Sequence, residues 1–123
     1  MDPDKAAKLA KKRQRYRERL TVALREEADP LAAYHEFVQW TLDTYKDDIP
    51  HSGLIELIDE ATRYFLDDDA YKSDLRYLKL WLLYAKLVED PTVIYAFILS
   101  KNIGKIYAET YSGYAEALHK RGK

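Results

Sequence analysis

The side chains that could carry out chemistry are three histidines and many carboxylates, in a chain of 123 residues without cysteine. No spacing among His35, His51 and His119 resembles that of a metal site. The segment "DDDAYKSD" at 67–74 resembles a calcium loop, but it lacks the central Gly and the closing Glu at position twelve. We interpret it as a polar turn that caps a following helix. Because a Gly-rich phosphate loop, a nucleophile elbow and a kinase signature are also missing, we expect no catalysis, metal or cofactor in this chain.

The composition predicts one folded domain that does not enter a membrane. Hydrophobic residues make up 47% of the chain and charged residues 33%. The lack of Cys excludes disulfides and thiolate metal sites, which fits a reducing compartment. The apolar runs are short and interrupted, so we expect no bilayer span. Because the N-terminus also lacks the apolar core of a signal peptide, we interpret the protein as intracellular.

The charges are segregated along the chain although the net charge is only −1. Residues 1–25 carry +6, residues 26–74 carry −11 and residues 75–123 carry +4. The basic segment 5–19 could bind nucleic acid or a membrane surface. We favour a solvated helix face, because the acidic middle of the chain supplies counter-charge. The apolar stripe of this helix would then dock on the next helix through Leu9, Tyr16, Leu20, Ala23 and Leu24.

The elements that must position these side chains are helices. Three Asp-Pro pairs, at 2–3, 29–30 and 90–91, each offer an N-cap acceptor followed by Pro at the first helical position. We predict helices over 3–27, 30–46, 52–66, 74–89, 91–101 and 105–120. Ser52 and Asp74 are the predicted caps of the third and fourth helices, and Gly104 suits a left-handed turn. Gly113, inside the last helix, indicates close approach by a neighbour.

The pattern aromatic-x-x-Tyr-Ala occurs twice, at 81–85 and at 111–115, in helices joined by short turns. This weak internal repeat favours an irregular tetratricopeptide-like array of about six antiparallel helices. We predict one domain overall, with residues 1–28 as a basic N-terminal helix packed on a helical domain at 29–123.

The helices at 74–89 and 91–101 are apolar around most of their circumference. In the first, the apolar arc covers about 220–240°, whereas a helix packed on one side needs only about 100° or somewhat more. Either neighbouring helices cover these side chains, or part of the arc forms a groove for a partner. We expect part of it to remain exposed, as binding surfaces do.

Several segments in order resemble the N-terminal region of the mitotic-checkpoint Bub/Mad family. The most characteristic is "YKSDLRYLKLWLLYA" at 71–85, and "IYAF", "NIG" and "YSGYAEAL" follow it at 94–97, 102–104 and 111–118. The N-terminal part of the resemblance consists of Asp29-Pro30-Leu31, Tyr34, Phe37-Val38 and Trp40. The resemblance covers residues 29–122.

The resemblance implies a tetratricopeptide-like domain that targets a checkpoint protein to kinetochores. In that family the domain binds a short amphipathic helical motif of the outer-kinetochore scaffold protein, and other checkpoint proteins are further partners. The implied localisation is the nucleus and the kinetochore, and in part the cytoplasm. The family's peptide contacts correspond here to Trp81, Tyr84, Leu87, Phe97 and Ile98.

Residues 1–28 contain no Lys-Glu-Asn motif, which favours the kinase-bearing Bub branch over the Mad branch. That branch carries a C-terminal Ser/Thr kinase domain in the full-length protein. The family also continues past "RG" at 121–122 with another helix pair. Two alternatives from the residues remain: a generic helical-repeat adaptor for an unrelated peptide, and nucleic-acid binding by the basic helix.

Overall fold

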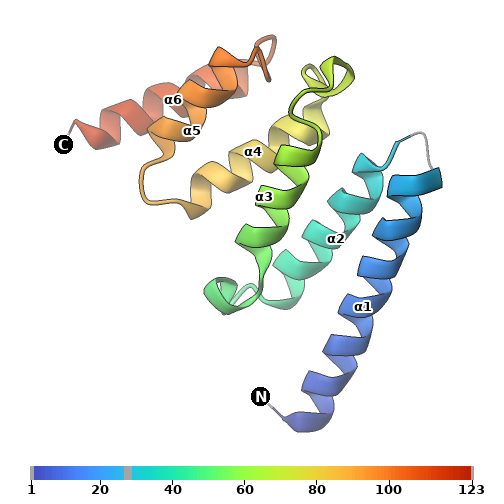
Figure 1. Cartoon of the computed structure of the whole chain (residues 1–123). Helices are drawn as coiled ribbons and strands as arrows, with labels where there is room; N and C mark the ends of the chain where they lie inside the picture. Colours follow the sequence, from blue (N-terminus) through green and yellow to red (C-terminus); the bar gives the residue numbers. More distant parts are fainter. Residues whose placement is uncertain (1, 27–28, 123) are drawn as a thin grey trace. The chain divides into compact units, whose positions relative to one another are not determined.

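The computed structural model describes residues 2–26 and 29–122 of the chain, which divides into two compact units, residues 1–52 and 53–123. The described residues fold into six α-helices and two short 3₁₀ turns, without a strand (Figure 1). The predicted all-α class is therefore confirmed, while the division at residue 28 stays a prediction. None of these helices combines the length and the apolar character that a membrane span requires.

The first unit consists of α1 (Pro3–Glu26), α2 (Leu31–Thr44) and a 3₁₀ turn at Ile49–His51. The Asp2 carboxylate accepts a hydrogen bond from the Asp4 N–H at 3.1 Å, as the first Asp-Pro pair predicted. Leu20 and Ala23 of α1 are fully buried, and α1 packs along α2 (Figure 1). This is the docking that the apolar stripe of the basic helix predicted.

Aromatic rings strengthen the contact between α1 and α2. The Tyr16 ring stacks on the rings of Phe37 and Trp40, with centroid distances of 5.5 Å and 5.1 Å. Such pairs add about 0.5–1.5 kcal/mol beyond the burial of their surface. The rings therefore fix the side of α1 that faces α2.

The second unit contains α3 (Leu54–Tyr64), a 3₁₀ turn at Asp69–Tyr71, α4 (Leu75–Leu87), α5 (Pro91–Ser100) and α6 (Ala108–Arg121). Each α-helix packs on the next, α3 on α4, α4 on α5 and α5 on α6. Tyr77 of α4 is completely buried, and its hydroxyl donates a 2.5 Å hydrogen bond to the Thr62 carbonyl of α3. This bond satisfies a polar group that would otherwise be costly to bury.

The caps of α4 and α5 are those that the sequence predicted. The Asp74 carboxylate accepts from the Arg76 N–H at 2.8 Å, and the Asp90 carboxylate accepts from the Thr92 N–H at 3.2 Å. Gly104 has a φ of 68°, the left-handed conformation expected of it. Gly113 also behaves as predicted, because a Cβ there would overlap the Tyr95 hydroxyl.

Three predicted helix starts differ from the structure. α2 starts at Leu31 rather than 30, and Pro30 holds its N-cap position instead of the first helical position. α3 starts at Leu54 rather than 52, and Ser52 lies before its N-cap position, where its hydroxyl donates to the Ile49 carbonyl at 2.6 Å. Gly53, with a φ of 79°, occupies the N-cap position instead. The last helix starts at Ala108 rather than 105, because the Gly104 carbonyl accepts from the Tyr107 N–H and from the Thr110 hydroxyl. These bonds keep residues 104–107 in a turn.

Candidate functional site

An aromatic cluster joins α4 and α5 in the second unit. The Trp81 ring stacks on Tyr84 at a centroid distance of 5.9 Å and meets the Phe97 ring at 5.5 Å. Tyr84 lies one helical turn after Trp81, and Leu87 lies one turn further on the same side of α4. The structure thus brings together four of the five predicted contact residues on neighbouring helices.

The five residues differ in exposure. Tyr84, Leu87 and Phe97 are half-buried, whereas Trp81 is 5% exposed and Ile98 is 0% exposed. We call Tyr84, Leu87 and Phe97 the aromatic surface. Trp81 lies beneath it and supports the rings of Tyr84 and Phe97. Ile98 points into the core, so its role as a peptide contact stays a prediction that would need the helix to move.

A polar edge from α3 borders the aromatic surface. The Tyr84 hydroxyl donates to Asp59 Oδ1 at 3.1 Å, and Arg63 Nε donates to the same oxygen at 2.9 Å. Burial, followed by the hydrogen bond to Asp59 and its negative charge, raises the pKa of Tyr84. Asp59 and Arg63 were not predicted from the sequence. Their i, i+4 spacing indicates an ion pair on one helix, but no signal in the sequence links that pair to Tyr84.

The opposite edge of the aromatic surface carries cations. The Lys101 ammonium lies 5.8 Å from the centroid of the Phe97 ring, close enough for a cation–π contact. Lys79 and Lys86 are exposed on α4. The Arg76 guanidinium, also on α4, binds the Asp74 carboxylate at 2.7 Å. That contact holds the pKa of Asp74 below its usual value and fixes the start of α4.

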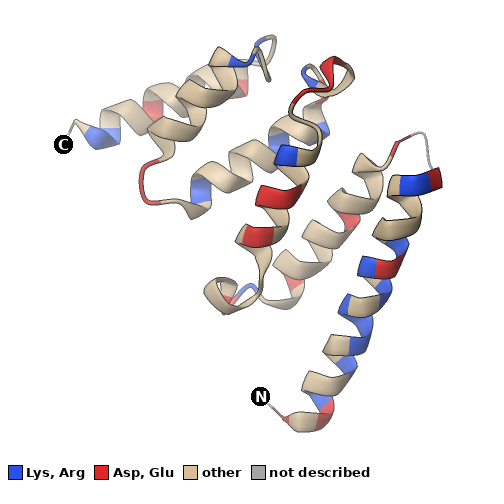
Figure 2. Cartoon of the chain, in the orientation of Figure 1, with Lys and Arg blue, Asp and Glu red and all other residues tan. Residues whose placement is uncertain are grey.

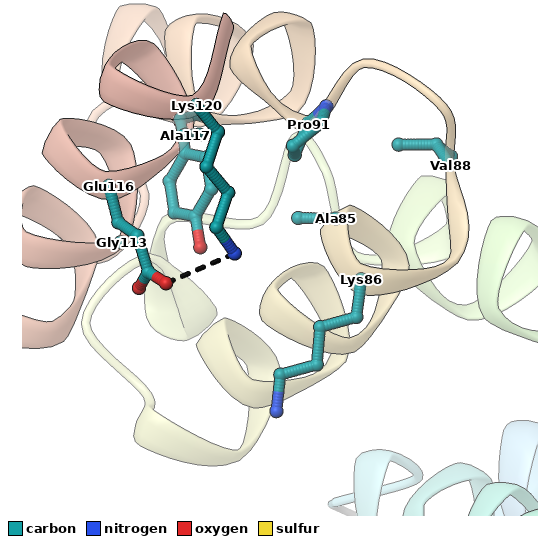
Figure 3. Close-up of a pocket in the computed structure, with 9 residues that line it drawn as sticks. Ala85, Lys86, Val88, Pro91, Gly113, Glu116, Ala117 and Lys120 are labelled. Carbon is teal, nitrogen blue, oxygen red and sulfur yellow. Dashed lines mark ion pairs between the residues drawn. The ribbon is translucent and has the colours of Figure 1, made fainter. Parts of the chain in front are cut away.

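A separate cavity of about 320 Å³ lies among α4, α5 and α6. Small side chains line much of it, among them Ala85, Gly113 and Ala117 (Figure 3). An ion pair between Lys120 and Glu116, 3.2 Å long, crosses its edge (Figure 3). The Tyr95 ring also borders it and stacks on Tyr114 at 5.8 Å. The cavity is distinct from the aromatic surface, since the two share no lining residue.

Across the described ranges no three His, Asp or Glu side chains gather in a way that could hold a metal ion. His51 instead contacts the Asp48 carboxylate at 2.8 Å in an exposed turn.

Comparison with known proteins identifies similar chains. The family described as "Mad3/BUB1 homology region 1" matches residues 11–123. The "Mitotic spindle checkpoint component mad3" of Schizosaccharomyces pombe is 33% identical over 95 residues, which cover 76% of this chain and 31% of that protein. The "Mitotic spindle checkpoint protein BUBR1" of Arabidopsis thaliana is 39% identical over 87 residues, which cover 71% of this chain and 22% of that protein. The chain thus spans a third or less of these relatives.

Solved structures show the same fold. A chain in the "Crystal Structure of Mitotic Checkpoint Complex" superposes with a TM-score of 0.90 at 29% identity, over 98% of this chain and 56% of that one. The "conserved N-terminal domain of the mitotic checkpoint component BUB1" superposes with a TM-score of 0.84 at 22% identity, over 95% of this chain and 64% of that one. The tetratricopeptide-like class is confirmed by these matches. Both Mad3 and BUB1 proteins occur among the similar chains and structures. Assignment to the kinase-bearing Bub branch therefore stays a prediction.

Proposed function

This chain belongs to the Mad3/BUB1 homology region 1 family of mitotic spindle checkpoint proteins, and from that premise we propose that it is a non-catalytic docking domain for a short amphipathic helix of the outer-kinetochore scaffold. Its peptide would lie on the aromatic surface of Tyr84, Leu87 and Phe97. The kinetochore, within the nucleus, would be its principal location, with part of the protein in the cytoplasm. Other checkpoint proteins are proposed as further partners of the full-length protein. If it is of the kinase-bearing branch, the full-length protein would also carry a Ser/Thr kinase domain.

The half-buried state of three large apolar side chains on adjoining helices is the observation that supports this proposal best. Large apolar side chains that converge on a patch and remain accessible are typical of binding anchors. The patch is also rigid, because the buried Trp81 ring contacts both Tyr84 and Phe97. A preformed surface loses little conformational entropy when a peptide binds.

The surface also favours a particular peptide chemistry. A helix that lies in a groove presents apolar anchors at i, i+3 and i+4, or i+7. The exposed Lys79 and Lys86, with Lys101 over Phe97, favour acidic residues beside those anchors. A generic adaptor for an unrelated peptide is one of the two alternatives that the sequence left open. Such an adaptor would not discriminate between the scaffold motif and a sequence-scrambled peptide of equal charge.

The test compares affinity and stability in the same variants. Leu87→Ala and Phe97→Ala should each weaken binding of the scaffold peptide by about 1–3 kcal/mol, roughly 5- to 150-fold. Each should cost under about 1.5 kcal/mol of unfolding free energy, because neither side chain is fully buried. Leu118→Ala is the matched control, since Leu118 is 47% exposed on α6 and lies outside the aromatic surface. Its affinity should equal that of the unmodified chain.

Two results would contradict the proposal. In one, Leu87→Ala and Phe97→Ala lose several kcal/mol of stability while the folded fraction binds normally, which would place both residues in the core. In the other, the scrambled peptide binds as well as the scaffold motif, which would favour the generic adaptor. Isothermal titration calorimetry and thermal unfolding measure both quantities.

A further inference from the structure

The basic side chains of α1 fall into two groups, and the first group is engaged by α2 and its following turn. The Arg13 guanidinium lies over the Trp40 and Tyr45 rings at 5.7 Å and 5.2 Å and donates to the Ser52 carbonyl at 2.7 Å. Arg17 lies over the Phe37 ring at 5.3 Å. Arg19 forms a 2.5 Å ion pair with Glu36. These three arginines help to hold the first unit together.

The second group makes no ion pair or hydrogen bond with any described residue. It consists of Lys5, Lys8, Lys11, Lys12 and Arg15, all exposed. Figure 2 shows how closely Lys and Arg positions follow one another along α1. At 100° per residue these five, with Arg19, lie within about 120° of the helix circumference and extend over about 21 Å of its length. Of the nearby acids, Glu18 accepts a hydrogen bond from Gln14, and Asp4 lies only at the first turn. The expected counter-charge from the acidic middle of the chain is thus seen at Arg19, which pairs with Glu36, and not at the other five cations.

A shallow hollow of about 260 Å³ lies in the middle of this basic face. Lys12, Arg15, Tyr16 and Arg19 line it. The Tyr16 ring, held by Phe37 and Trp40, forms its base. An anionic group in the hollow would meet Lys12 and Arg15, while Arg19 at its border is already paired with Glu36.

We propose that the basic face of α1, defined as Lys5, Lys8, Lys11, Lys12 and Arg15, binds the phosphate backbone of duplex nucleic acid without reading its sequence. From Lys5 to Arg15 the face extends over about 15 Å of helix. That length corresponds to about five phosphates of one strand at a spacing of about 3.4 Å. The proposal rests on the first unit alone and is independent of the peptide site on α4 and α5.

Other polyanions fit the face less well. Insertion of a helix into a membrane surface requires a free apolar side, and the apolar side of α1 is already packed on α2, with Leu20 and Ala23 fully buried. A specific protein partner requires large apolar anchors within the patch, and the basic face offers cations with little else. The phosphate backbone of a duplex, in contrast, can be bound by cationic side chains alone.

The experiment measures anisotropy of a labelled 20-base-pair duplex titrated with the whole chain between 50 and 200 mM salt. Five phosphate contacts predict a slope of log affinity against log salt of about −4.5. Lys8→Gln, Lys12→Gln and Arg15→Gln together should reduce that slope by about 2.7 and weaken binding at 0.1 M salt by roughly 10²-fold or more. The control combines Arg25→Gln, Lys46→Gln and Lys105→Gln, three exposed cations that do not belong to the face, with the same change in charge.

The proposal predicts that the control keeps most of the affinity and the slope, and that both variants retain the circular dichroism and melting temperature of the unmodified chain. Equal losses in the two variants would overturn it, because net charge alone would then explain the binding. A poly-glutamate peptide or anionic vesicles binding through the same residues, with no measurable duplex binding at 50 mM salt, would also overturn it.

Discussion

The hydroxyl of Tyr84 donates a hydrogen bond to Asp59 Oδ1 across 3.1 Å, which ties the proposed peptide surface on α4 to the polar face of α3. Tyr84 therefore has two separable parts, a ring that stacks on Trp81 and a hydroxyl that contacts α3. Tyr84→Phe should lower the free energy of unfolding by about 1 kcal/mol, since one hydrogen bond is lost. Peptide affinity should change less than about threefold, because the apolar contact area remains.

Tyr84→Ala, which also removes the ring, should weaken binding by about 1–3 kcal/mol. Equal losses of affinity in the two variants would assign the recognition to the hydroxyl.

Tyr77 should make the second unit sensitive to alkaline pH. Burial raises the pKa of Tyr77 to about 12, from an ordinary value of 10.0. A group whose pKa is raised by folding contributes stability that is present below its unfolded pKa and is lost as the pH rises through its folded pKa. The free energy of unfolding should therefore fall between pH 10 and 12, by about 2 kcal/mol from this residue. Denaturation curves at intervals of half a pH unit measure the decline.

Tyr77→Phe provides the control for that pH dependence. The variant loses the hydrogen bond to the Thr62 carbonyl, so it should be less stable at neutral pH. Its free energy of unfolding should nevertheless fall less steeply above pH 10. The remaining slope would come from Tyr84 and Tyr95, whose pKa values burial also raises. An unchanged slope in Tyr77→Phe would contradict the assignment.

Gly113 should be intolerant of a methyl group although it lies inside a helix. A Gly→Ala change at an exposed helical site stabilises by about 1 kcal/mol. Here the new Cβ would overlap the hydroxyl of Tyr95, which approaches α6 from α5. Gly113→Ala should therefore destabilise by about 1–3 kcal/mol. Tyr95→Phe in the same chain should recover part of the loss, because it removes the nearest atom. Additive effects of the two changes in thermal unfolding would mean that the two residues do not clash.

The sequence predicted the structure well where the signal was local. Asp74 and Asp90 cap α4 and α5 because an Asp before a helix can reach an N–H two residues later, a relationship contained within three residues. Ser52 had the same type of signal. The helix nevertheless starts two residues later, at Leu54, with Gly53 in a left-handed conformation at the N-cap position. The local signal located the turn but not the residue at which the helix starts.

The candidate site could be predicted only in part. A helical wheel at 100° per residue places Trp81, Tyr84 and Leu87 within about 120° of one another, and in the structure the rings of Trp81 and Tyr84 stack. The wheel could not show that the Tyr84 hydroxyl would reach Asp59, because that contact spans 25 residues and depends on how α3 packs on α4. It also could not separate Phe97 from Ile98, because α5 is apolar on all sides and periodicity then carries no information.

Phe97 and Ile98 therefore give the sharpest test of the site, since they are consecutive in the chain and opposite in environment. Ile98 is completely buried, so Ile98→Ala should lower the free energy of unfolding by about 2–5 kcal/mol. Peptide affinity of the folded fraction should stay nearly unchanged.

Phe97 is half-buried and lies against the Trp81 ring, so Phe97→Ala should show the reverse pattern, with a small loss of stability and a clear loss of affinity. Chemical denaturation combined with calorimetry separates the two effects. If Ile98→Ala weakened binding in the folded fraction as much as Phe97→Ala, the peptide would have to reach beneath the aromatic surface, and α5 would have to move when the peptide binds.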